Sequence, residues 1–225
     1  MREICYLTRR NMKLFFKDKG MFFSSLITPV ILLVLYSTFL SGIYRDSFES
    51  SLPAGFSVDR ALINATVGGQ LISSLLAVSC VTVAFCSNLL MIQDKTSGAI
   101  RDFTVSPVRR PALAIAYFAA SALVTLIVNF TALTVSLIYL AATGWFLSVG
   151  DVFLLLLDVL LLTLFGTALS SCVNFPLSTN GQASAVGTIV SAGYGFICGA
   201  YMPISSFSTG LQRALSFLPG TYGTS

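Results

Sequence analysis

The chain of 225 residues has a net charge of +4, yet only 10% of its residues are charged and 55% are hydrophobic. A soluble domain usually carries about 25% charged residues, so this composition excludes a soluble globular protein and predicts a surface that largely faces lipid. The chain contains no histidine, which excludes histidine metal sites, imidazole general bases and nucleophiles activated by histidine.

Residues 1–20 are predicted to form an amphipathic helix that lies in the membrane interface. At about 100° per residue, apolar and basic side chains separate onto two faces. The apolar face holds Ile4, Cys5, Leu7, Met12, Leu14, Phe15 and Phe16, and the basic face holds Arg2, Arg9, Arg10, Lys13 and Lys17. Such a helix places its apolar side at the acyl boundary and its cations near anionic headgroups. Two roles stay open, a topology anchor and a lever that transmits a partner's motion into the first span.

Five segments are long and apolar enough to cross a bilayer, which takes about 20 residues. They are residues 21–43, 68–92, 112–142, 152–173 and 183–202. Most Lys and Arg residues lie before the first span or between the second and third. Because basic residues favour the cytoplasmic side, the N-terminus is predicted to be cytoplasmic. Since proteins with this layout commonly end with another crossing, we expect a sixth transmembrane helix that this sequence lacks.

The loop at residues 93–110 is the most informative polar segment. Residues 98–103 are predicted to form a short helix that presents Ile100 and Phe103 on one face. An apolar pair flanked by Arg101 and Asp102 suits insertion into a groove on another protein, whereas an ordinary cytoplasmic loop needs no such pair. Both interpretations remain open from the residues alone.

A strip of small residues in the fifth span is a candidate for close helix packing. Small residues recur at every fourth position of the fifth span, namely Ala183, Gly187, Ser191, Gly195 and Gly199. Such a strip lets helices approach closely, either within the subunit or across a dimer interface, and Gly195→Leu should prevent it.

Asp158 is the one carboxylate deep inside a span. A charge at that depth is costly, so it faces a polar passage or is protonated against a polar group. Asn88 and Asn129 are weaker cases of the same kind, and hydrogen bonds between helices suffice to explain them.

The loop also resembles the corresponding segment of ABC-2 type transporter permeases, the membrane-spanning subunits of exporters similar to multidrug exporters. Asp94, Gly98, Ser106 and Pro107 match the family's pattern of an acidic residue, a glycine, a short helix and Ser-Pro, with Ala99 where the family often has Thr. Further similarity lies in Thr8-Arg9-Arg10-Asn11, in Phe16-Lys17-Asp18-Lys19 and in Pro29. Towards the C-terminus it lies in the stretch from Gly199 to Ser206 that contains Pro203, and in Leu218-Pro219-Gly220-Thr221-Tyr222, where Leu218 replaces an expected Asn. The resemblance covers essentially the whole chain, and the order and spacing of its motifs carry it.

The resemblance implies an all-α polytopic membrane protein in which residues 94–103 form a coupling helix seated on a cytoplasmic ATPase. It also implies that residues 203–225 form an extracellular re-entrant segment. The expected partners are an ABC ATPase subunit, a second permease subunit and membrane lipids, with no nucleic acid. No cofactor is expected on this chain, because ATP and Mg would be bound by the partner. The family also implies a multi-pass protein of the plasma membrane, of prokaryotic origin.

The expected function is export of an amphipathic drug, lipid or peptide, with Asp158 and Pro203 as candidate passage or gating residues. The alternatives are a permease for a lipid-linked polysaccharide and a membrane scaffold or sensor without a transport cycle. A secondary carrier finds no support, because ionisable residues within the spans are almost absent and no internal repeat occurs.

Overall fold

A computed structural model describes residues 2–35, 60–105, 108–143 and 147–198, together with the single residues 38, 42, 145, 200, 208, 210, 212 and 215. For residues 60–65, 104, 142 and 143 it describes the backbone only. Four expectations therefore fall wholly or mostly outside the described residues: the break at Ser106 and Pro107, the roles of Gly199 and Pro203, and the re-entrant segment at 203–225.

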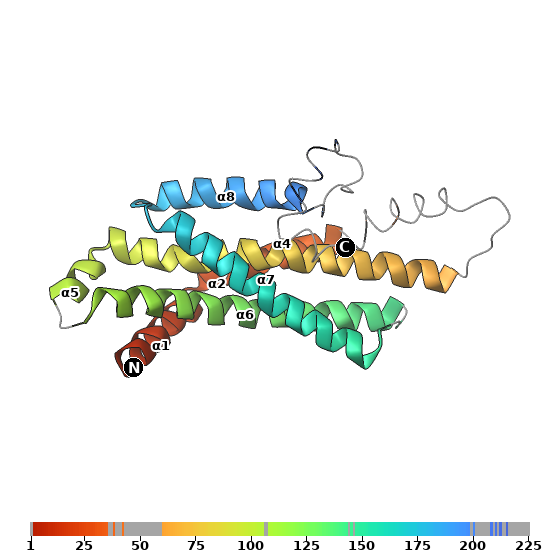
Figure 1. The fold of residues 1–225 in the computed structure, drawn as a ribbon, viewed down its shortest axis with the longest axis horizontal. Coiled ribbons are helices and arrows are strands. Elements are labelled where there is room, and N and C mark those ends of the chain that lie inside the picture. Colours follow the sequence, from red (N-terminus) through yellow and green to blue (C-terminus); the bar gives the residue numbers. More distant parts are fainter. Residues whose placement is uncertain are drawn as a thin grey trace.

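The described part of the chain is helical throughout and contains no strand (Figure 1). The helices are α1 (Arg2–Lys17), α2 (Lys19–Leu35), α4 (Arg60–Thr96), α5 (Ala99–Val105), α6 (Arg110–Thr143), α7 (Val149–Asn174) and α8 (Asn180–Ile197). The all-α prediction is confirmed.

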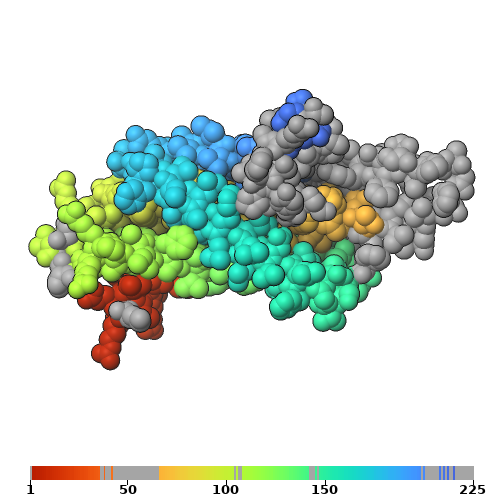
Figure 2. All heavy atoms as spheres, viewed as in Figure 1, coloured from red at the N-terminus to blue at the C-terminus, as the bar shows by residue number. Residues whose placement is uncertain are grey.

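Helix α4 is the central element of the bundle. It packs against α2, α6, α7 and α8, and its side chains Leu75, Val78 and Val81 are almost completely buried. On the face shown in Figure 2, the side chains of α6, α7 and α8 cover most of α4. In contrast, α7 leaves large apolar side chains such as Phe153, Leu154 and Leu161 exposed. An exposed surface of this apolar character suits lipid rather than water.

Three helices of the described residues are long and apolar enough to cross a membrane: Thr66–Thr96, Arg110–Ala141 and Val149–Asn174. A fourth candidate is the pair α1 and α2, which are bent by 76° at their junction. Helix α8 begins at Asn180, close to the expected start of the fifth span, but its many Gly, Ser and Thr residues make it less apolar than these three. A polytopic membrane protein is confirmed, and the count of five spans stays a prediction.

Asp18 explains why α1 and α2 are separate helices. Its carboxylate oxygen Oδ1 accepts hydrogen bonds from the backbone N–H groups of Gly20 (2.9 Å) and Met21 (3.2 Å). These are donors that the first turn of a helix leaves without an internal partner. The capping carboxylate therefore starts α2 afresh and lets α1 lie across the direction of the bundle.

The buried face of helix α1 lies within the expected apolar face but is narrower and partly polar. It packs on α6, and its buried residues are Leu7, Thr8, Asn11 and Phe15, whereas the expected apolar face included Cys5, which is exposed. The residues toward the bundle thus include two polar side chains, and the Asn11 side-chain oxygen accepts a hydrogen bond from the neighbouring Arg10 at 3.0 Å.

A close approach between the backbones of α4 and α7 is made at a glycine that the sequence analysis did not single out. A Cβ atom on Gly166 of α7 would lie 2.9 Å from the backbone carbonyl oxygen of Cys80 in α4. At Gly187, in the predicted strip of small residues, a Cβ would meet Phe85 only at an ordinary distance of 3.9 Å. Tight packing between α4 and α7 therefore depends on Gly166.

Polar residues within the spans form hydrogen bonds between helices, as predicted. The Asn88 amide nitrogen of α4 donates to the Ser170 and Ser171 hydroxyls of α7, and its oxygen accepts from Ser121 of α6 at 2.9 Å. Asn129 of α6 donates to Thr163 of α7 at 3.2 Å. These bonds connect the three helices at two levels.

Candidate functional site

The turn between α4 and α5 depends on Gly98. Helix α4 ends at Thr96, and Gly98 follows with a φ of +83°, in the left-handed region that favours glycine. The carbonyl oxygen of Gly98 then accepts a hydrogen bond from the Arg101 N–H at 2.8 Å. The short helix predicted from the sequence is present, although it runs over Ala99–Val105 rather than residues 98–103.

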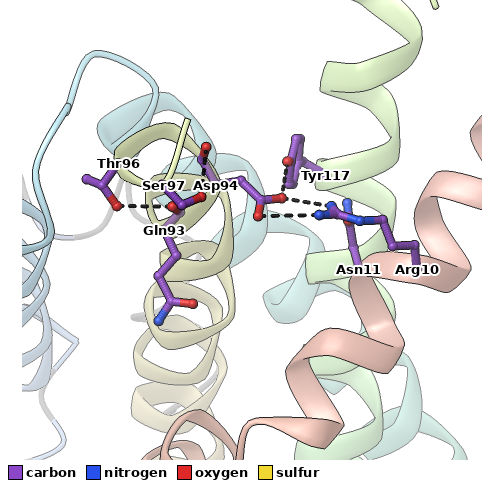
Figure 3. A network of polar contacts seen from close by, with 7 residues as sticks. All are labelled: Arg10, Asn11, Gln93, Asp94, Thr96, Ser97 and Tyr117. Atoms are coloured by element: carbon purple, nitrogen blue, oxygen red, sulfur yellow. Dashed lines mark hydrogen bonds and ion pairs between the residues drawn. The ribbon is translucent and has the colours of Figure 1, made fainter. Parts of the chain in front are cut away.

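Asp94, one turn before this corner, is buried and holds three helices together. The Arg10 guanidinium of α1 donates to its Oδ2 atom at 2.8 Å, and the Tyr117 hydroxyl of α6 donates to the same oxygen (Figure 3). Hydrogen bonds to a charged group are among the stronger ones in proteins. Asp94 therefore fixes the end of α4 against both α1 and α6.

Arg10 extends this network to the short helix α5. Its guanidinium lies 5.0 Å from the centre of the Phe103 ring, close enough for a cation–π contact. Partial burial disfavours the charged guanidinium, but the hydrogen bond and the charge of Asp94, with smaller contributions from Tyr117, raise the pKa of Arg10 above its usual value. Arg10 stays charged and contacts the end of α4 and α5 at once. We call Arg10, Asp94, Phe103 and Tyr117 the α1–α5 junction.

Lys95 connects the end of α4 to the end of α7. Its ammonium group donates to the backbone carbonyl oxygens of Phe175 (2.6 Å) and Leu177 (3.0 Å), directly after α7. The C-terminal end of a helix leaves carbonyl groups without partners and carries a partial negative charge, so a lysine stabilises it. The end of α4 is thereby tied to the end of α7.

The outward face of α5 differs from the predicted one. Ile100 and Phe103, the expected apolar pair, are half-buried, and Phe103 already contacts Arg10. Arg101, Asp102 and Val105 are exposed, and Val105 has 88% of its surface accessible. The apolar side chain that α5 leaves exposed is therefore Val105.

Two cavities adjoin these helices. The first, which we call the α5 cavity, has a volume of about 660 Å³ and is lined by residues of α4, α5, α6 and α7, including Lys95, Ile100 and Arg110. The second, the α8 cavity, has a volume of about 400 Å³ and lies between α2, α4 and α8. Gly187 and Ser191 of the predicted small-residue strip line it, together with Thr82. The Thr82 hydroxyl is buried and has no hydrogen-bond partner among the described residues.

The remaining candidates lie apart from the junction. Asp158 is half-buried on α7, and it lines neither cavity. Gly195 is buried on α8, and Pro203 and Gly199 lie outside the described residues.

Three residues of this region were not identified from the sequence. Arg10 was assigned to the headgroup-facing side of α1, Tyr117 looked like one apolar residue among many in a span, and Val105 was overlooked beside Ser106 and Pro107. Of the residues that make the α1–α5 junction, only Asp94 carries a sequence signal for such a contact, because an acidic residue next to a span needs a cationic or hydrogen-bonding partner. Which partner it finds depends on how α1 and α6 are placed.

The sequence matches the family model described as ABC-2 type transporter over residues 2–225. No curated protein and no solved structure matches the chain.

Proposed function

Because it matches this family over nearly its full length, the chain belongs to the ABC-2 type transporters, and we propose that it is the permease subunit of an exporter driven by a separate ABC ATPase. Two permease subunits would face each other across a passage, and ATP would be bound and hydrolysed by two attached ATPase subunits. The cargo we propose is an amphipathic drug, lipid or peptide taken from the cytoplasm or the inner leaflet. The N-terminus and α5 would then lie on the cytoplasmic side of the plasma membrane.

The observation that carries this proposal is the α1–α5 junction. A coupling element has to receive force at an exposed surface and pass it to the membrane helices through stiff contacts. Helix α5 has such a surface in Arg101, Asp102 and Val105. It joins α4 through the short turn at Gly98, and it contacts α1 through Phe103 and Arg10. A displacement of α5 would therefore move α1 and α4 together.

The α8 cavity supports the choice of an amphipathic cargo. Its walls combine Phe85 and Leu89 with the hydroxyl-bearing residues Thr82 and Ser191. We propose that this cavity is part of the passage and that an accessible hydroxyl in its wall, such as that of Ser184, bonds to a polar group of the cargo.

The deciding experiment compares two valines with the same exposure. Val105 on α5 and Val149, the first residue of α7, are both 88% exposed, and α5 and the start of α7 lie at opposite ends of the bundle (Figure 1). Val105→Asp should abolish co-purification of a P-loop ATPase from native membranes in mild detergent, because a carboxylate cannot enter an apolar groove without losing its hydration. Val149→Asp should leave the amount of ATPase unchanged.

The result also separates the exporter from a scaffold or sensor without a transport cycle. If wild-type chain brings no P-loop ATPase with it, the coupling role fails. If Val105→Asp still brings a stoichiometric amount, the ATPase docks elsewhere and α5 is not the coupling helix. The double change Ile100→Asp with Phe103→Asp is a weaker test, because both side chains also make contacts within the chain.

A further inference from the structure

The α5 cavity is apolar along its walls and basic at one end. Leu113, Ile115 and Phe118 of α6 line its apolar part, and the Ile115 side chain is 52% exposed. Its volume of about 660 Å³ lies within the range of about 300–1,000 Å³ that is usual for ligand sites. An exposed apolar crevice along a membrane helix is in contact with acyl chains unless another helix covers it.

Two cations line this cavity, and no acidic side chain of the described residues does. Arg110 is exposed at the first residue of α6, and Lys95 lies near the last residue of α4. The nearby carboxylate of Asp94 is already neutralised by Arg10. Lys95 donates to two carbonyl oxygens, and an ammonium group has three N–H donors, so one donor is left for a ligand. The charge of the cavity therefore favours an anion.

The two cations lie where the apolar stretches of α4 and α6 end. The span of α4 extends to Thr96, directly after Lys95, and the span of α6 begins at Arg110. Basic residues at such positions attract anionic lipid headgroups, and each contributes about 1 kcal/mol near the surface. A molecule with an anionic head at this level and an apolar tail along α6 matches both halves of the cavity.

We propose that the α5 cavity binds an anionic phospholipid of the cytoplasmic leaflet. Its phosphate lies between Lys95 and Arg110, and an acyl chain lies along Leu113, Ile115 and Phe118. The assignment to this leaflet rests on the orientation given under the proposed function. A zwitterionic phospholipid carries the same phosphate together with a cationic group that is repelled by Lys95 and Arg110, and a free phosphate ion would leave the apolar wall unused.

Such a lipid would also affect how motion of α5 is passed to the membrane helices. Ile100 of α5 and Phe175 after α7 line the same cavity, so a bound lipid contacts both the coupling helix and the segment held by Lys95. Lipid binding would stabilise the position of α5 described here. This lipid site is separate from the proposed passage, because the α8 cavity lies between α2, α4 and α8.

The test uses the purified chain in mild detergent, titrated with phosphatidylglycerol or phosphatidylcholine, and native mass spectrometry counts the bound lipids. Wild type should bind phosphatidylglycerol more tightly than phosphatidylcholine. Arg110→Gln should weaken phosphatidylglycerol binding about fivefold, which corresponds to about 1 kcal/mol, and should weaken phosphatidylcholine binding less, so that the preference for phosphatidylglycerol falls. The matched control is Arg109→Gln, because Arg109 is also exposed but does not line the cavity, and it should bind like wild type.

A second variant tests the apolar wall without changing any charge. Ala114 lines the cavity and is exposed, so Ala114→Trp should obstruct the acyl chain and weaken binding of phosphatidylglycerol while leaving helix content by circular dichroism unchanged. Competition with inorganic phosphate tests the headgroup alone, and it should not displace the lipid.

Three outcomes would overturn the proposal. They are equal binding of the two lipids by wild type, equal losses in Arg109→Gln and Arg110→Gln, and displacement of the lipid by inorganic phosphate with no effect of Ala114→Trp. The last result would assign the basic end to a soluble anion. These measurements need no ATPase, so failure of the lipid site and failure of the proposed exporter are distinguishable.

Discussion

Replacement of Arg10 by alanine tests whether the α1–α5 junction holds the end of α4 in place. The Asp94 carboxylate is buried, with 7% of the residue exposed, and it receives hydrogen bonds from Arg10 and Tyr117. Arg10→Ala leaves this charge with the Tyr117 hydroxyl alone and removes the contact with Phe103. The change should therefore lower the stability of the folded chain and loosen α5.

The expected loss follows from the partners that remain. A hydrogen bond to a charged group contributes about 1.5–3 kcal/mol, and because 35% of the Arg10 side chain is exposed, solvent screening places the loss at about 2 kcal/mol. Asp94→Asn should cost less, about 1 kcal/mol, because the amide oxygen still accepts from Tyr117 and water can solvate Arg10. In the double variant Asp94 is already neutral, so the removal of Arg10 no longer leaves a buried carboxylate without its partner. The stability loss of the double variant should therefore be smaller than the sum of the two single losses, by a coupling energy of about 1 kcal/mol.

The assay is SDS-induced unfolding of the purified chain in mixed micelles, which gives the free energy of unfolding for wild type, both single variants and the double variant. Arg9→Ala is the matched control, since Arg9 precedes Arg10 on the same helix but is exposed, and it should change stability little. Equal effects of Arg9→Ala and Arg10→Ala, or strictly additive effects of Arg10→Ala and Asp94→Asn, would refute the reasoning.

Three further predictions follow from single positions. Gly98→Ala forces an alanine to a φ of +83° and should cost about 1–2 kcal/mol in the same unfolding assay; an unchanged value would mean that the turn can relax. Gly166→Ala places a methyl group 2.9 Å from the Cys80 carbonyl oxygen and should destabilise the chain by about 1–3 kcal/mol. Gly193→Ala on α8, where no heavy atom lies within 4 Å of the added Cβ, is its control and should be neutral or slightly stabilising. Asp158 lines neither cavity, but a carboxylate inside a span is costly, so we expect a role in gating. Asp158→Asn should retain normal expression but impair ATP-driven transport of an amphipathic dye in reconstituted vesicles, and wild-type transport would remove this role.

Local sequence signals predicted the short helix after α4 and the roles of two amides. The segment at residues 98–103 indicated a short helix, although the structure places Gly98 in the turn before it. Asn88 and Asn129 indicated hydrogen bonds between helices, because a polar side chain within a span has to find a partner. The helix boundaries were less well determined, since α4 extends to Thr96 while the predicted span ended at residue 92.

The face that each helix turns inward could not be predicted in the same way. A helix that is apolar on all sides gives no periodic signal for its buried face, so neither the inward position of Tyr117 nor the close approach at Gly166 could be inferred. On α5, the spacing favoured Ile100 and Phe103 as the outward pair, but the placement of α1 and α6 turned them partly inward and left Val105 exposed.

Composition by itself determined the membrane class, because too few charges are present to cover a soluble surface. The long apolar runs then predicted helical spans, because backbone groups within a bilayer must be satisfied inside each span. The α1–α5 junction was decided by the tertiary structure alone. Its ion pair joins Arg10 and Asp94 across 84 positions of sequence, and it exists because the bend at Asp18 directs α1 back across α6. Long-range contacts of this kind depend on the relative placement of whole helices, which local propensity and hydrophobicity do not specify.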